Sequence, residues 1–110
     1  MSAPQRRSHY RIQYDKERAP KLAFSGHHFP VIDVSEEGIR FLAEGVKGFK
    51  EGDDVVGTLT FEDNESFIIR GPVIRVQKEH ISIKLSRAAI PLRKIMAEQR
   101  RLLQKFEKYE

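Results

Sequence analysis

The sequence contains no cysteine, and none of its apolar runs approaches the roughly 20 residues needed to cross a bilayer. The lack of cysteine excludes a disulfide framework and thiolate chemistry. The opening MSAPQRRSHYR also lacks the apolar core of a signal peptide. We therefore expect a soluble protein of the reducing cytoplasm, and its 110 residues suit a single domain.

The charge balance is basic. Twenty Lys and Arg residues stand against sixteen Asp and Glu residues, which gives a formal net charge of +4 and a pI near 9.5. This balance favours an anionic partner, but charge alone leaves DNA, RNA, lipid and nucleotide open. A hydrophobic content of 39%, with seven Phe residues, is enough for a modest folded core.

Apolar and polar residues alternate over most of the chain up to residue 87. The clearest case is ISIKL, where Ile81, Ile83 and Leu85 share one face. FEDNES predicts a hairpin turn and Gly71-Pro72 a bulge or bend. We expect strands at 10–14, 21–24, 28–34, 38–43, 54–61, 66–77 and 80–86. So many short antiparallel strands predict a β-barrel over residues 12–87, because closure removes exposed sheet edges.

A helical period replaces this alternation over residues 90–108, where apolar residues recur at steps of three, four and seven. Pro91 suits the start of a helix. We expect Leu92, Ile95 and Met96 to close the open side of the barrel. The later apolar residues are expected to reach a partner or a second subunit, and these are Leu103, Phe106 and Tyr109.

The same helix carries charged residues one turn apart. Lys94 pairs in this way with Glu98, and Glu98 with Arg101. We expect both pairs to be solvated surface pairs worth a few tenths of a kcal/mol, with no role in function.

The stretch DVSEEGIR, residues 33–40, brings an acid, a hydroxyl and a glycine together after an apolar run. If the chain is extended there, Ile32 and Val34 share the packed face while Asp33 and Ser35 share the other. A strand end closed by an Asx or Ser turn at Gly38 explains the pattern equally well.

A second polar stretch, QRRSHYRIQ, places Arg6, Arg7 and Arg11 just before the first expected strand. A guanidinium group can bond the O6 and N7 acceptors of guanine, grip phosphate or stack on a purine. We expect residues 1–11 to be a mobile arginine-bearing segment, although an ordinary basic tail is the alternative.

Read together, the two stretches describe a site for a guanine nucleotide. Asp33 can accept from the N1 and N2 donors of guanine, while Arg7 and Arg11 serve its other edge and the phosphates. Ser35 can donate to the ligand, and Gly38 lets it approach the backbone. Arg40 offers a further cation from the next strand.

The sequence resembles the PilZ family, whose RxxxR and (D/N)xSxxG motifs match Arg7-Ser-His-Tyr-Arg11 and Asp33-Val-Ser35-Glu-Glu-Gly38. The resemblance extends over nearly the whole chain, although HISIKL lacks the glycine that leads the final strand in many members. It implies a six-stranded antiparallel barrel with a C-terminal helix. It also implies a non-catalytic bacterial receptor that binds cyclic di-GMP through these motifs and signals to an effector protein.

Arg6 bears on stoichiometry. Two intercalated cyclic di-GMP molecules concentrate four negative charges, and Arg6 adds a third cation beside Arg7 and Arg11. In the family, an arginine at this position is associated with uptake of the dimer, so we expect two ligands per chain.

Two other classes of function compete with this interpretation. A small basic barrel can bind single-stranded nucleic acid on aromatic platforms, for which the candidates are Tyr10, Tyr14, Phe24 and Phe29. An enzyme would use the histidines as metal ligands or Ser35 as a nucleophile. His9, His27, His28 and His80 have no supporting spacing, because adjacent strand residues point to opposite faces. We therefore expect no catalysis, no metal and no cofactor other than the ligand.

Overall fold

The structure is a computed structural model that describes residues 11–86 and 89–108, with side chains described up to residue 102. Its strands are β2 (Ile12–Gln13), β3 (Lys21–Phe24), β4 (His27–Val34), β5 (Gly38–Leu42), β6 (Asp54–Thr60), β7 (Ser66–Gln77) and β8 (His80–Lys84). A 3₁₀ turn, η1 (Lys16–Arg18), follows β2, and helix α1 (Leu92–Lys108) follows the last strand. Arg6, Arg7 and the rest of the predicted N-terminal segment before Arg11 lie outside the described residues.

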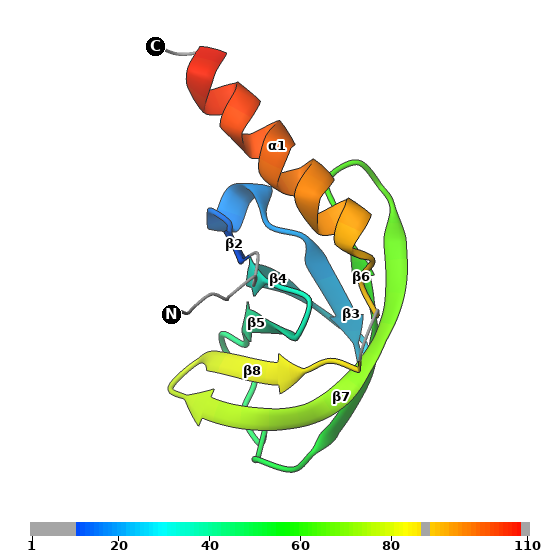
Figure 1. Cartoon of the computed structure of the whole chain (residues 1–110). Coiled ribbons are helices and arrows are strands. Elements are labelled where there is room, and N and C mark those ends of the chain that lie inside the picture. Colours follow the sequence, from blue (N-terminus) through cyan, green and yellow to red (C-terminus); the bar gives the residue numbers. More distant parts are fainter. Residues whose placement is uncertain (1–10, 87–88, 109–110) are drawn as a thin grey trace, which may run out of the picture.

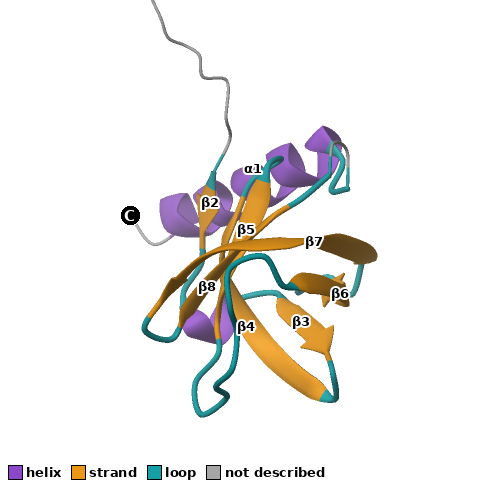
Figure 2. Cartoon of the chain, turned by 90° about the horizontal axis from the view of Figure 1, so that it is seen from below, coloured by secondary structure: helices purple, strands orange, loops and turns teal. Residues whose placement is uncertain are grey.

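The strands form one antiparallel sheet in the order β2-β4-β3-β6-β7-β8-β5, and pairing of β4 with β5 closes it. The six longer strands, β3 to β8, therefore make the barrel that the sequence predicts. The short β2 pairs with the end of β4 beyond β3. Figure 2 shows the strands around a common interior with α1 behind them, and Figure 1 shows α1 at the end away from the β7–β8 hairpin.

The barrel interior is apolar because each strand contributes alternate residues to it. Fully buried side chains come from every long strand, among them Leu22, Val31, Phe41, Leu59, Ile69, Ile81 and Ile83. The predicted inward face of ISIKL is confirmed. The FEDNES hairpin turn is also present, with Asn64 at positive φ and Phe61 bonded to Glu65 through the backbone.

Two irregularities shift side chains relative to simple alternation. In β4 the register shifts between Val31 and Asp33, so Val31 and Val34 are buried and Ile32 is not. The prediction that Ile32 and Val34 share the packed face is therefore wrong, because a bulge adds one residue. In β7 the bulge lies between Val73 and Arg75, just after the Gly71-Pro72 step, where the strand changes partner from β6 to β8.

Helix α1 packs on the barrel differently from the prediction. Ile95 is fully buried, but Leu92 and Met96 are 41% and 37% exposed. Lys94 and Glu98, expected on the surface, are each only 2% exposed, so the helix face that meets the barrel carries charge. The prediction of solvated pairs is wrong because Lys94, Glu98 and Arg101 have partners on the barrel, which a helix period cannot show. No helix in the described ranges is long and apolar enough to span a membrane.

Candidate functional site

A polar pocket of about 500 Å³ lies where Arg11 and the end of β4 meet β5, β8 and β7. This volume is within the roughly 300–1,000 Å³ typical of small-molecule sites. Four cationic side chains and two carboxylates line it: Arg11, Arg40, Arg75 and Lys84, with Asp33 and Glu37. The pocket contains four of the predicted site residues besides Arg11, namely Asp33, Ser35, Gly38 and Arg40.

Strand register arranges five polar residues in one row across the sheet. Gln13 of β2 pairs with Asp33 of β4, which pairs with Arg40 of β5. Arg40 pairs with Ser82 of β8, and Ser82 with Arg75 of β7. Residues directly opposite each other on neighbouring strands present their side chains to the same face. Asp33, Arg40, Ser82 and Arg75 all line the pocket, so four of the five residues in this row belong to its wall.

Asp33 is the buried acid of the site, with 7% of its surface exposed. Its Oδ1 lies 3.6 Å from Nε of Arg11, and its Oδ2 lies 3.5 Å from Nη2 of Arg40. Burial raises the pKa of the Asp33 carboxyl, while the charges of Arg11 and Arg40 oppose this effect. The carboxylate therefore lies between two guanidinium groups, and both distances are longer than those of a close N–H···O hydrogen bond.

Arg40 contributes an unused donor. Its Nε is buried and has no hydrogen-bond partner among the described residues. A buried N–H without a partner costs free energy that a ligand acceptor would recover. Arg40 was predicted to add a further cation, and the structure places it opposite Asp33 in the pocket lining.

Ser35 and Gly38 close the turn between β4 and β5 as well as lining the pocket. The Ser35 hydroxyl lies 3.3 Å from the Gly38 carbonyl and accepts from the Glu37 amide at the same distance. A Cβ on Gly38 would meet the Ile83 carbonyl at 2.5 Å. The glycine is thus required by the close approach of β8, a reason that the sequence interpretation did not include.

Arg75, Ser82 and Lys84 were missed by sequence reasoning. Lys84 pairs with Gly38 across β8 and β5, which places it beside the turn of the DxSxxG motif. In the part of the chain that the structure describes, no ion pair engages Arg75 or Lys84. The only signal for Arg75 and Lys84 in the sequence is that they are basic residues facing outward on predicted strands. That signal indicates a site only once the strand register shows which residues lie beside them.

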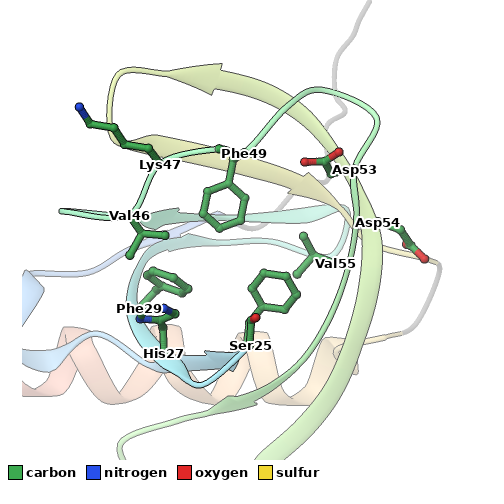
Figure 3. Close-up of a pocket in the computed structure, with 11 residues that line it drawn as sticks. Ser25, His27, Phe29, Val46, Lys47, Phe49, Asp53, Asp54 and Val55 are labelled. Atoms are coloured by element: carbon green, nitrogen blue, oxygen red, sulfur yellow. The ribbon is translucent and has the colours of Figure 1, made fainter.

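A second hollow of about 390 Å³ lies between the β3–β4 turn and the loop after β5, and its lining mixes aromatic and aliphatic side chains with polar and charged ones. Figure 3 shows Phe29, Phe49, Val46 and Val55 around a common space, with Lys47 and Asp54 directed away from it. Phe29 packs on Phe41 and Phe49 at centroid distances of 5.2 and 6.0 Å. These three rings pack together beside the hollow.

This packing bears on the nucleic-acid alternative. Phe29 and Tyr14 are 4% and 7% exposed, so neither is a free stacking platform, whereas Phe24 is half-buried against the core. Tyr10 lies outside the described residues. His27 stacks on Phe29, and within the described ranges no group of three or more His, Asp or Glu residues is arranged to hold a metal ion. His9 also lies outside these ranges.

Comparison with known proteins identifies the fold family. The family model for the PilZ domain matches residues 5–106. The chain belongs to the PilZ family. PilZ domains are non-catalytic receptors of cyclic di-GMP, so the prediction of a non-enzymatic receptor domain is confirmed at the level of the family. A search of curated proteins found no match.

Among solved structures, the PilZ barrel of this chain is similar to the inhibitor of motility MotI (DgrA) of Bacillus subtilis. The TM-score is 0.59 at 17% sequence identity, over 97% of this chain and 55% of the other. At this identity the similarity concerns the fold. The PilZ chain described here spans little more than half of that protein.

Proposed function

We propose that the polar pocket binds cyclic di-GMP. The observation that carries the proposal is the cross-strand row, in which a buried carboxylate lies between arginines and one guanidinium N–H has no partner among the described residues. Asp33 accepts from the N1 and N2 donors of guanine. Arg11 and Arg40 complete the contact by donating to the O6 and N7 edge of guanine or to a phosphate.

The two residues found from the register extend the site. Arg75 and Lys84 line the pocket without an ion-pair partner among the described residues, and they carry positive charge toward the phosphates. Ser82 supplies a hydroxyl between Arg40 and Arg75. Arg6 and Arg7 reach the ligand from the segment that precedes Arg11.

Ligand capture orders this arginine-bearing segment against the barrel and so changes a surface offered to an effector protein. Closely spaced guanidinium groups repel each other until an anion neutralises them, which couples their ordering to binding. The four charges of an intercalated dimer favour the addition of Arg6 to Arg7 and Arg11. We therefore propose two cyclic di-GMP molecules per chain.

Calorimetric titration with cyclic di-GMP, cyclic di-AMP and GTP tests the ligand. We expect saturable heat with cyclic di-GMP and much weaker binding of cyclic di-AMP, which presents an adenine edge to Asp33. Equal affinity for both cyclic dinucleotides, or no heat with cyclic di-GMP, contradicts the proposal. Arg7→Ala and Arg11→Ala should each weaken binding by about 1 to 3 kcal/mol, the scale of a bidentate guanine contact.

The stoichiometry is tested separately. Arg6→Leu should lower the number of bound ligands from two to one, because Arg7, Arg11 and Asp33 still hold one molecule. A wild-type count of one, or a count of two in the variant, means that Arg6 does not set the number.

A further inference from the structure

Three segments that are distant in the sequence meet around the buried Glu98 of α1, because Tyr14 bonds its carboxylate and the β6–β7 turn bonds its neighbours Lys94 and Arg101. The Tyr14 hydroxyl donates to its Oε1 at 2.6 Å, and Arg101 donates to both of its oxygens at 2.9 and 3.1 Å. Lys94 lies 3.8 Å from Oε2 and bonds Asp63 of the β6–β7 turn at 2.6 Å. Burial, followed by the bond to Glu98, raises the pKa of Tyr14 far above its ordinary value, so its hydroxyl remains a donor.

Tyr14 lies on the same short strip of chain as Arg11. Residues 11 to 14 alternate between two faces: Arg11 and Gln13 are exposed, whereas Ile12 and Tyr14 are buried. The exposed face borders the polar pocket, where Arg11 is near Asp33 and Gln13 is opposite it. The buried face meets α1 through the Tyr14 hydroxyl. One strip thus contacts the ligand pocket on one face and the helix on the other.

The attachment of this strip to the barrel is slight. Strand β2 has only two residues, Ile12 and Gln13, and Tyr14 adds one backbone bond to the Ile32 carbonyl at 2.9 Å. A two-residue strand at a sheet edge has little stability of its own, so side-chain anchors on its buried face determine where it lies. The anchor that the structure describes for Tyr14 is Glu98.

We propose that Glu98, through Tyr14, is a positioning residue for Arg11, and that ligand binding in the pocket is thereby coupled to the docking of α1. This inference rests on the proposed function. A ligand that contacts Arg11 stabilises the position of residues 11–14, and the bond from Tyr14 to Glu98 then stabilises the docked helix. By linkage the effect is reciprocal, so a docked helix strengthens ligand binding by the same factor.

Hydrogen exchange of the wild-type protein with and without saturating cyclic di-GMP is the first test. Ligand should slow exchange of the α1 amides over residues 92–102 by about fivefold or more beyond any slowing in β6, the scale of a typical coupling. Strand β6 serves as the internal reference because it contributes no residue to the pocket lining. Global stabilisation alone would slow both regions equally.

Two variants separate positioning from simple support. Tyr14→Phe keeps the buried ring and removes the bond to Glu98, so the ligand-dependent slowing of α1 should disappear and affinity should fall by up to the same factor. Lys94→Met removes the bond between the helix and Asp63 but keeps the Tyr14 bond. Exchange of the α1 amides should therefore be faster both with and without ligand, while the ligand-dependent slowing remains. Lys16→Met, which removes an exposed ion pair to Glu44, should behave as the wild type.

The outcomes are distinguishable from a failure of the proposed function. Calorimetric heat with α1 slowed no more than β6 overturns the coupling and leaves the receptor assignment intact. Full slowing of α1 in Tyr14→Phe also overturns it. Absence of heat with cyclic di-GMP overturns both proposals. The wild-type comparison decides the matter even if a variant does not fold.

Discussion

Among the residues that the structure describes, two carboxylates are buried near pairs of cations, and their arrangements differ. Glu98 under α1 has contacts of 2.6 to 3.1 Å from Tyr14 and Arg101, within hydrogen-bonding range. Asp33 in the pocket has its two arginines at 3.5 and 3.6 Å, and the Nε of Arg40 has no partner in the described ranges. The first acid is satisfied within the protein, whereas the second lies in a set of groups that a ligand can complete.

The two acids illustrate two roles of a buried charge in a small domain, one in holding the fold together and one in offering contacts to a ligand. A satisfied buried ion pair fixes one geometry, but removing one partner is costly because the other charge remains buried in the protein interior without compensation. An incompletely satisfied acid lowers the stability of the empty protein and leaves interaction energy for the ligand. Substitutions at the two acids should therefore have opposite consequences for folding and for binding.

The largest expected effect is on folding, from Glu98→Ala. This change leaves the Tyr14 hydroxyl buried without its acceptor and removes the carboxylate that Arg101 bonds, while Lys94 keeps Asp63. We expect a loss of about 3 kcal/mol in the free energy of unfolding. Urea denaturation at neutral pH measures it. Glu44→Ala, which removes an exposed partner of Lys16, is the control and should change stability by less than about 1 kcal/mol. Similar losses in both variants would mean that the Glu98 cluster has no special role.

Asp33→Asn should have the opposite profile. It removes the negative charge and replaces one of the two acceptor oxygens for the guanine N1 and N2 donors with an NH₂ donor, so affinity for cyclic di-GMP should fall about tenfold or more. The melting temperature without ligand should not fall, because burial disfavours the charge that is removed. Asp54→Asn is the matched control, since Asp54 also pairs with an arginine, Arg70, but outside the pocket. A destabilised empty protein with normal affinity would contradict the comparison.

Arg75→Ala and Lys84→Ala test the far wall of the pocket, with a smaller effect. Each should reduce affinity severalfold through loss of a phosphate contact, and the loss should shrink as salt is added. Arg70→Ala on the same strand as Arg75 is the control, because Arg70 does not line the pocket. Equal affinities for all three variants would exclude this wall from the site.

The smallest effect is a difference in pH dependence. The pKa of Asp33 is raised above its ordinary 3.8, mainly by burial, so its contribution to stability decreases as the pH rises through the raised value. The pKa of Asp63 is lowered, mainly by its bond to Lys94, so its contribution is present above 3.8 and is lost as the pH falls. Urea denaturation at about pH 3 and pH 7 measures both. Asp33→Asn should raise the free energy of unfolding more at about pH 7 than at about pH 3. Asp63→Asn should lower it only at about pH 7.

Much of the fold could be predicted from the sequence because its alternation is regular. The six long strands lie within a few residues of their predicted positions, as in ISIKL, where successive side chains point to opposite faces. The prediction failed at β4, because a bulge moves Ile32 out of step without leaving a sign in the residue types. The strand expected over residues 10–14 is only two residues long in the described part of the chain.

The candidate site was predictable only as motifs. RxxxR and DxSxxG identify Arg11, Asp33, Ser35 and Gly38 because their chemistry suits guanine and phosphate, and the structure brings all four to one pocket. Arg7 and Arg6 remain predictions, since they lie outside the described residues. Arg75 and Lys84 could not be assigned, because a basic residue on a strand is uninformative until its neighbours on other strands are known.

The sequence by itself determined the local properties: which segments extend, where they turn, and which residues carry donors and acceptors of the kind that a guanine nucleotide needs. Only the tertiary structure decided which of these residues share a surface, because strand register is a relation between segments far apart in the chain. It placed Arg75 two strands from Arg40, and it buried Lys94 and Glu98, whose residue types predict exposure. Charged residues are buried when partners elsewhere in the fold satisfy them, and those partners are set by packing.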